Sequence, residues 1–261
     1  MTKRTLLIDA DIVAFKFAAK AQRKYAFGVA VDDLADVTPK IDEYLAELLK
    51  QLEATDLIIC LSSPSAEGWR KGILPSYKAN RDESTRPALL GAVKDYMEVS
   101  YPSYRRPTLE ADDIMGILST HPTIVPGERV IVSSDKDMKT IPGWLYNPDK
   151  DTKARRIGEM EADYWHLYQT LVGDATDFYK GAPGCGDKCA AKTLNYPSWP
   201  DEGHVQYAWL KVVARFLAKG LTEADALLQA RVARICRHTD YDFKQKQVRL
   251  WTPQGETVGT T

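Results

Sequence analysis

Residues 109–118 read Leu-Glu-Ala-Asp-Asp-Ile-Met-Gly-Ile-Leu, and the rest of the chain can be interpreted outward from them. Ile114, Ile117 and Leu118 recur at the i, i+3, i+4 spacing of a helical face that packs against a core. We therefore expect a buried helix that begins close to residue 110.

Three acids precede this apolar face: Glu110, Asp112 and Asp113. The helix dipole favours carboxylates in a first turn, which is the simplest explanation of the cluster. Like charges this close repel each other, however, and a half-buried carboxylate without a partner is costly. The pattern therefore predicts that cations lie among these acids.

Further acids follow apolar runs elsewhere in the chain. They come as three pairs: Asp9 and Asp11, Asp135 and Asp137, and Asp174 and Asp177. Carboxylate oxygens are the ligands that hard divalent ions prefer. The sequence therefore predicts a metal site assembled from separate segments.

Strand-like and helix-like patterns alternate along the chain, which favours an α/β fold with a mostly parallel sheet. Residues 6–8, 57–61 and 130–132 read as buried strands, and residues 41–52 read as a helix. Further helices are expected over residues 12–21, from about 87, over 164–172, from about 188 and over 205–236; a turn or hairpin is expected over 149–157 and a strand after 245. In such sheets the ligand site lies beyond the carboxyl ends of the strands, where the acids would meet in one cleft.

Composition is that of an ordinary globular protein, with 261 residues, 44% hydrophobic and 27% charged, and a formal net charge of −1. We see no signal peptide and no apolar stretch near 18 residues, and we therefore expect no membrane span. The four cysteines, Cys60, Cys185, Cys189 and Cys236, are expected to be free thiols in a reducing cytoplasm. A zinc site of the last three with His238 is disfavoured, because no Cys-x-x-Cys pair is present.

Residues 69–86 have a different character, since they mix aromatic residues and turn formers with five basic and two acidic residues. The segment leaves the ligand edge of the sheet, and its composition suits the phosphates and bases of a single strand. A plain solvated loop is the alternative. The candidate nucleic-acid contacts are Arg70, Lys71, Tyr77, Lys78 and Arg81.

Residues 181–192 form a glycine-rich run, Gly-Ala-Pro-Gly-Cys-Gly-Asp-Lys-Cys-Ala-Ala-Lys. Exposed backbone amides at a turn and at a helix N-terminus bind phosphate, and lysines add charge. A simple Gly-Pro loop is the alternative, but the glycine spacing together with lysine favours binding of a DNA backbone. The candidate contacts are Gly181, Gly184, Gly186, Lys188 and Lys192.

Taken in order, these motifs resemble the flap endonuclease and 5′-nuclease superfamily, most closely its bacteriophage 5′→3′ exonuclease branch. The resemblance covers residues 6–251. It is carried by Ile-Asp at 8–9, Tyr-Lys-Ala-Asn-Arg at 77–81, Glu-Ala-Asp-Asp at 110–113, Ser-Asp-Lys-Asp at 134–137, Gly-Asp-Ala-Thr-Asp at 173–177 and the glycine-rich run.

The resemblance implies a PIN-like catalytic domain over residues 1–160, with an arch at about 64–100. A helix–three-turn–helix DNA-binding region with C-terminal helices would occupy 161–261. It also implies two or more Mg²⁺ or Mn²⁺ ions and allows K⁺ at the helix–three-turn–helix. The implied metal ligands are Asp9, Glu110, Asp112, Asp113, Asp135, Asp137, Asp174 and Asp177. The implied catalytic residues are Lys78, Arg81, Asp9, Glu110, Asp112 and Asp135.

The implied activity is metal-dependent 5′→3′ exonuclease action with flap endonuclease activity. Its substrates would be DNA with a 5′ end, flap or nick and RNA primer–DNA hybrids, during phage replication or recombination in the cytoplasm of the infected bacterial host. Other phage replication proteins are candidate partners.

One departure from the family pattern is Ser62-Ser63-Pro64, where the family usually places an aspartate. A neutral hydroxyl is a weaker metal ligand, so a DNA-structure-binding protein that has lost catalysis is one alternative. Another is a haloacid-dehalogenase-like phosphatase, suggested by Leu-Ile-Asp-Ala-Asp at 7–11. That alternative leaves the glycine-rich run and the other acids unexplained.

Overall fold

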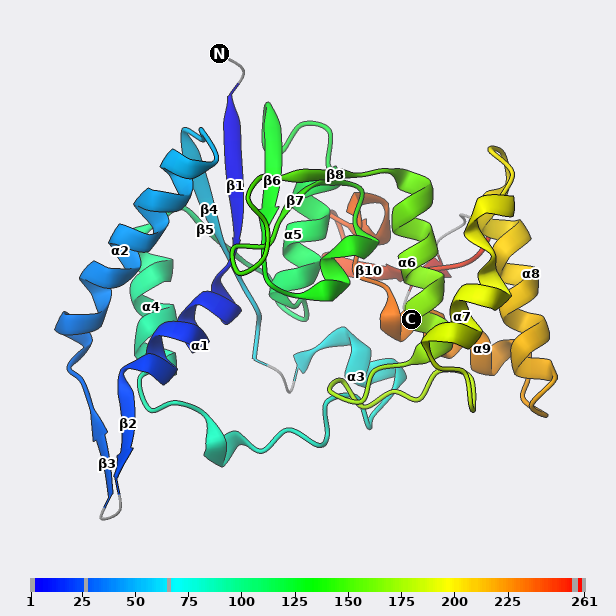
Figure 1. Cartoon of the computed structure of the whole chain (residues 1–261), viewed down its shortest axis with the longest axis horizontal. Coiled ribbons are helices and arrows are strands. Elements are labelled where there is room, and N and C mark those ends of the chain that lie inside the picture. Colours follow the sequence, from blue (N-terminus) through cyan, green and yellow to red (C-terminus); the bar gives the residue numbers. More distant parts are fainter. Residues whose placement is uncertain (1–2, 26–27, 65–66, 255–257, 260–261) are drawn as a thin grey trace.

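The computed structural model describes residues 3–25, 28–64, 67–254 and 258–259. A six-stranded sheet in the order β5-β4-β1-β6-β7-β8 lies in one half of the molecule (Figure 1). The strands are β1 (Arg4–Asp9), β4 (Asp56–Leu61), β5 (Ser103–Arg105), β6 (Glu128–Val132), β7 (Gly143–Tyr146) and β8 (Arg155–Ile157). Neighbours pair in parallel except β7 and β8, which form the expected hairpin. The α/β fold with a mostly parallel sheet is confirmed.

Helices cover both faces of the sheet because the side chains of β1 alternate. Leu6 and Ile8 pack in one cluster with α1 (Ala10–Lys20), α2 (Leu34–Gln51) and α4 (Leu90–Ser100). Leu7 points to the opposite face and packs with α5 (Ala111–Thr120). The helix that contains residues 111–118 is thus buried against the sheet, as its apolar spacing predicts.

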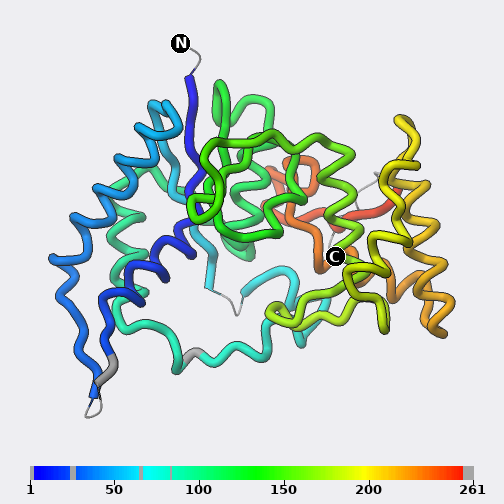
Figure 2. Tube along the Cα trace, in the orientation of Figure 1, coloured from blue at the N-terminus to red at the C-terminus, as the bar shows by residue number. Residues whose placement is uncertain are grey.

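The other half of the molecule is helical (Figure 1). Its apolar cluster is formed by α6 (Glu159–Val172), α7 (Asp187–Leu194), α8 (His204–Leu217) and α9 (Glu223–Ala233). The remaining elements are a hairpin of β2 (Gln22–Tyr25) and β3 (Gly28–Val31), α3 (Trp69–Ile73), short 3-10 helices at Glu83–Thr85, Lys136–Thr140, Tyr196–Ser198 and His238–Asp240, and a small antiparallel sheet of β9 (Tyr241–Asp242), β10 (Gln247–Leu250) and β11 (Val258–Gly259). Figure 2 shows the long segment between α3 and α4, which runs from the helical half back to the sheet half.

Several expected boundaries differ from the structure. The helix expected over 41–52 begins earlier, at Leu34, and includes Pro39. The helix expected over 205–236 is two helices, separated by a turn in which Gly220 has a φ of 75°. The β2–β3 hairpin was not expected, since its sequence lacks a clear alternation of apolar and polar residues.

The expectation of four free thiols is wrong for two of them. Cys185 and Cys189 form a disulfide, because the turn before α7 brings their Cα atoms to 5.1 Å. Cys60 and Cys236 are free and buried. Cys185 packs in the helical cluster and Cys236 packs against α5, so these cysteines do not share a zinc site. Within the described ranges, no helix is both long and apolar enough to cross a membrane.

Candidate metal and nucleic-acid site

A pocket of about 680 Å³ lies at the carboxyl ends of the central strands. It brings together acids from four separate segments, as the sheet topology predicts. The acids that line it are Asp9, Asp11, Glu110, Asp112, Asp135, Asp137 and Asp177. Basic side chains line the same pocket: Arg70, Lys78, Arg81, Arg86, Lys94 and Arg105.

The inner acids of the pocket have few partners. Asp9 ends β1, and its carboxylate accepts hydrogen bonds from Ser133 Oγ at 2.7 Å and from the backbone N–H of Ile12 at 3.2 Å. Burial, with the nearby charge of Asp11, raises the pKa of Asp9 to about 7.

Asp112 lies in the first turn of α5 and lines the same pocket. Burial, followed by the charges of Asp9 and Asp135, raises its pKa well above the usual range. In the described part of the chain, no donor is hydrogen-bonded to the Asp112 carboxylate. Asp9, Asp112 and Asp135 therefore form a crowded group of carboxylates, and the charge of Lys78 offsets only part of the repulsion at Asp112.

A second group of acids lies beside the first. Asp137 accepts a hydrogen bond from Gln169 Nε2 at 2.7 Å, and burial together with the charge of Asp135 raises its pKa to about 6. Asp174 follows α6 and accepts a hydrogen bond from Lys136 Nζ at 2.7 Å. Its backbone pairs with Tyr179, which closes the turn that presents Asp177 to the pocket.

The Tyr-Lys-Ala-Asn-Arg motif packs on this acidic turn. The hydroxyl of Tyr77 lies 3.0 Å from Glu110 Oε2 and 2.8 Å from Asp177 Oδ2. Lys78 donates to Glu110, and its backbone N–H donates to the carbonyl of Asp177 at 2.9 Å. Arg81 forms an ion pair with Asp177 at 2.8 Å. The motif thus places two cations among the acids, as the crowding of carboxylates predicts.

Arg70 lines the pocket, but its guanidinium donates to acceptors inside the protein. Its side chain is 3% exposed, and its guanidinium donates to both carboxylate oxygens of Asp113 at 2.8 Å. It also donates to Glu110 at 3.0 Å and to the carbonyl of Val232 at 3.0 Å. The DNA contact of Arg70 therefore stays a prediction, since its hydrogen-bond donors are occupied inside the protein.

Asp113 lies outside the acid-lined pocket and is fully buried. Besides Arg70, it accepts hydrogen bonds from Trp69 Nε1 at 2.9 Å and from the backbone N–H of Cys236 at 3.1 Å. A carboxylate saturated in this way fixes the start of α5, where it also accepts the backbone N–H of Glu110 at 3.2 Å. Lys71 lies beside Arg70 on α3 and is partly exposed.

The serines that follow β4 form hydrogen bonds with backbone groups at the start of α5. Ser62 Oγ accepts the N–H of Ala111 at 2.9 Å, so it satisfies the first amide of α5. Ser63 is buried, and its N–H donates to the carbonyl of Leu109 at 2.9 Å. Both serines line the pocket, at the position where an aspartate was expected.

Several lining residues were missed by sequence reasoning. Lys94 on α4 forms an ion pair with Asp11 at 2.9 Å. Arg105 at the end of β5 pairs with Glu98 at 2.7 Å. Phe15 on α1 lines the pocket although its ring is 51% exposed. Phe15 could have been identified as a pocket residue because its apolar ring lies exposed on a helix that otherwise packs on the sheet.

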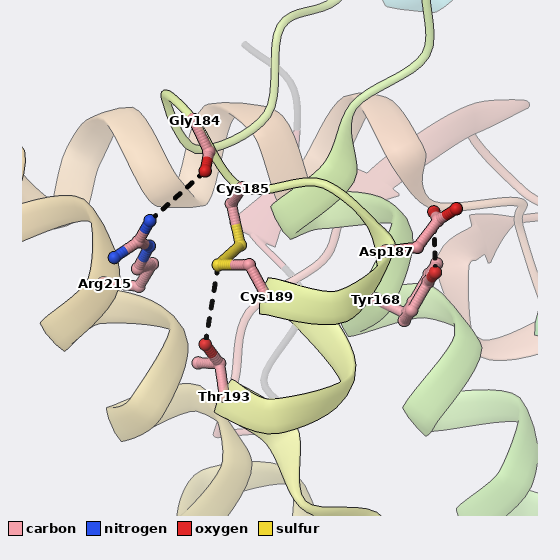
Figure 3. The surroundings of a disulfide bond; sticks show 7 residues. All are labelled: Tyr168, Gly184, Cys185, Asp187, Cys189, Thr193 and Arg215. Carbon is pink, nitrogen blue, oxygen red and sulfur yellow. Dashed lines mark hydrogen bonds between the residues drawn. A yellow bond between two sulfur atoms is a disulfide. The ribbon is translucent and has the colours of Figure 1, made fainter.

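The glycine-rich run lies apart from this pocket and leads into α7 (Figure 3). Gly181 has a φ of 62°, and a Cβ there would lie 2.4 Å from the nitrogen of Gly173, so only glycine fits. Gly186 is the N-cap of α7 and has no side-chain hydrogen bond of its own. Lys188 and Lys192 are exposed on this helix, as binding to a phosphate backbone would require.

The other contacts of the run, drawn in Figure 3, fix its position. The carbonyl of Gly184 accepts a hydrogen bond from Arg215 Nη2 at 3.4 Å, and Asp187 accepts one from the hydroxyl of Tyr168 at 2.8 Å. The Cys185–Cys189 disulfide joins the turn to the first turn of α7.

The acids are spread around the pocket and do not converge on one point. Among the described residues, no three His, Cys, Asp or Glu side chains already form a group that could hold a metal ion. Basic side chains hold Glu110, Asp174 and Asp177 in ion pairs.

Comparison with known proteins gives consistent matches. Residues 4–147 match the family described as 5′-3′ exonuclease, N-terminal resolvase-like domain. The chain is 30% identical to the exodeoxyribonuclease of Enterobacteria phage T3, over 97% of this chain and 94% of the relative. It is 30% identical to the exonuclease of Escherichia phage T7, over 96% and 94%. It is 27% identical to a flap endonuclease Xni of Vibrio campbellii, over 85% and 89%.

Among solved structures, the chain resembles the phage T5 5′-exonuclease with bound zinc, with a TM-score of 0.61 at 16% identity, over 88% of this chain and 89% of that one. It also resembles a complex of the T5 D15 flap endonuclease with DNA and metal ions, with a TM-score of 0.57 at 15% identity, over 87% and 93%. At these identities the similarity shows a shared fold.

Proposed function

The chain belongs to the 5′-3′ exonuclease family, and we propose that it hydrolyses phosphodiester bonds at the 5′ ends of DNA in the acid-lined pocket. It is a nuclease with 5′→3′ exonuclease and flap endonuclease activity. The observation that supports the location is the group of Asp9, Asp112 and Asp135, in which burial and mutual repulsion raise the pKa values of Asp9 and Asp112, although the charge of Lys78 offsets part of this effect at Asp112.

This group fits divalent metal ions of the Mg²⁺ or Mn²⁺ class. Its donors are all carboxylate oxygens, which such ions prefer. Asp9, Asp112 and Asp135 would hold one ion, and Asp137, Asp174 and Asp177 would hold a second. When bound, the ions would activate a water molecule and stabilise the leaving oxygen. Asp113 is not included in this set, because Arg70 occupies it.

The basic residues of the pocket would act on the substrate. Lys78 and Arg81 lie at the rim of the acids and would offset the charge that develops on the scissile phosphate. Lys94 would do the same from α4. Glu110 would position Lys78, to which it is already paired. The exposed ring of Phe15 would stack on a base, since stacking tolerates any sequence.

The substrate would extend in two directions from the pocket. Residues 64–100 would form an arch that handles the 5′ strand, with Lys71 as one contact, as part of a catalytic domain over 1–160. The glycine-rich run, within a DNA-binding region over 161–261, would grip the duplex through its amides, Lys188 and Lys192. The same proposal includes a K⁺ ion bound at this run and RNA primer–DNA hybrids as further substrates. It also includes other phage replication proteins as partners and action in the cytoplasm of the infected host.

The test uses 5′-labelled flap and nicked duplexes, with Mg²⁺ or with a chelator. We expect cleavage of both substrates only with Mg²⁺. Binding without cleavage in both conditions would instead identify a protein that recognises DNA structure alone. Hydrolysis of small phosphoesters in place of DNA would overturn the assignment of the substrate.

A further inference from the structure

A second cavity, of about 230 Å³, lies between the N-terminus of α8, the side of α6 and residues 234–240. Residues 251–253 also line it. The segment 232–237 separates it from the acid-lined pocket. Val232, Ala233 and Ile235 line the acidic pocket, whereas Arg234 and Arg237 line the second cavity.

The two arginines supply more donors than the protein uses. Arg234 is 6% exposed, and its Nε donates to Asp240 at 2.8 Å, but its Nη1 is buried and has no acceptor among the described residues. Arg237 donates from Nη2 to Asp163 at 2.7 Å and to the carbonyl of Thr140 at 3.0 Å. Its Nε is likewise buried without a described acceptor. Since each guanidinium carries five N–H groups, most of these donors remain without a partner in the described protein.

The N-terminus of α8 adds further donors to the same cavity. This helix of 14 residues begins after Gly203, which provides no side-chain hydrogen bond to the first amides. His204, Val205 and Gln206 of this first turn line the cavity. Unsatisfied amides and the positive end of the helix dipole favour an anion at this position.

The charges around the cavity lead to the same conclusion. Asp163 and Asp240 each pair with one arginine, and Asp163 also pairs with His204 Nε2 at 2.9 Å. Two acids therefore face two guanidiniums and a histidine. Burial, followed by the charge of Arg234, lowers the pKa of Arg237 to about 10. An additional anion would reduce this effect and accept the unused hydrogen bonds.

We propose that this cavity binds a small oxyanion of the phosphate class. An apolar ligand would leave the unpartnered donors of the two arginines unsatisfied. A cation would find both acids of the cavity, Asp163 and Asp240, already paired with arginines. The volume of about 230 Å³ is below the range of about 300–1,000 Å³ typical of pockets for drug-sized ligands, which favours a small ion. Free phosphate and a phosphate of a DNA backbone share this chemistry.

The test measures the melting temperature with inorganic phosphate against chloride at fixed ionic strength. The variant is Gln206→Glu, which places a carboxylate at the cavity from an exposed position. An acid in a helical first turn is tolerated, so the variant should fold. Gln245→Glu makes the same charge change at an exposed residue outside the cavity and is the control.

At a phosphate concentration of about five times its Kd, binding should raise the melting temperature of the wild type by about 2–4 °C. Gln245→Glu should keep this rise, and Gln206→Glu should lose most of it. Equal rises in all three proteins would overturn the proposal, because the phosphate would then bind elsewhere. Absence of any rise in the wild type would also overturn it.

A short duplex without added phosphate distinguishes the two sources of the oxyanion. If the DNA backbone supplies it, Gln206→Glu should bind the duplex more weakly than Gln245→Glu. If free phosphate supplies it, the two variants should bind the duplex equally well and differ only in the phosphate-dependent rise. In both cases, the phosphate-dependent rise in melting temperature must be smaller in Gln206→Glu than in Gln245→Glu.

Discussion

Replacing Arg70 by Met tests whether this residue organises the site or contacts DNA. The methionine would keep much of the side-chain volume but remove the cation from a position that is 3% exposed. Asp113 would remain fully buried and lose both of its ion-pair hydrogen bonds. Glu110 and two backbone carbonyls, those of Val232 and Arg234, would lose a donor as well.

Breaking a buried ion pair by removing one partner costs about 3–5 kcal/mol, because the other charge stays buried. For a chain of this size, that loss corresponds to about 2–4 °C per kcal/mol, so the melting temperature should fall by about 6–20 °C. The expected effect of the neighbouring control Lys71→Met is within about 0.5 kcal/mol, because Lys71 is partly exposed.

Urea unfolding followed by far-UV circular dichroism gives the free energy of unfolding of each variant. DNA affinity is measured in a chelator below the melting range of the less stable variant. A loss of stability below about 1 kcal/mol in Arg70→Met would contradict the assigned role. Weaker DNA binding at unchanged stability would show that Arg70 contacts the substrate after all.

Three further predictions concern the acidic pocket and its substrate contacts. Asp112→Asn should abolish Mg²⁺-dependent cleavage and leave the fold intact, since it removes one of several repelling charges; cleavage near the wild-type rate would contradict the metal assignment. Lys78→Ala should lower the turnover rate far more than the affinity for DNA. Lys188→Ala should instead weaken duplex binding and reduce the salt dependence of that binding by about one charge. The same phenotype in both variants would refute this division of roles. Ser63→Asp should lower the Mg²⁺ concentration needed for half-maximal cleavage, and an unchanged or higher requirement would place Ser63 outside the metal site.

The sequence predicted the architecture well because buried parallel strands are apolar over their whole length. Residues 6–8 and 130–132 are apolar throughout and form central strands. The position of the acids that follow them, at the carboxyl edge of the sheet, is a consequence of this placement. The motif 77–81 was found because of its resemblance to a family. Its packing on Asp177 depends on a contact between residues about one hundred positions apart, which no local pattern encodes.

The roles of Arg70 and Asp113 could not be predicted, since a charged residue in a basic segment is normally exposed. Only the folded chain shows that α3 inserts Arg70 between α5 and residues 232–236. Lys94 was missed for a related reason, because only the folded chain brings this residue of the amphipathic helix α4 to Asp11. The disulfide was missed because the expectation of free thiols rested on a reducing cytoplasm and not on the distance between the two cysteines.

The way in which Cys236 meets α5 has a consequence for how the protein is made. A Cβ at Gly116 would lie 2.4 Å from the carbonyl oxygen of Cys236, so the segment that follows α9 packs directly on the helix backbone. Ile235, Tyr241 and Val248 complete the same apolar cluster as α5. During synthesis the strands leave the ribosome first, but the outer face of α5 stays uncovered until these last residues emerge. A nascent chain that ends near residue 160 would therefore leave this face of α5 exposed to solvent, and the proposed catalytic domain over 1–160 would need the later residues to complete its core.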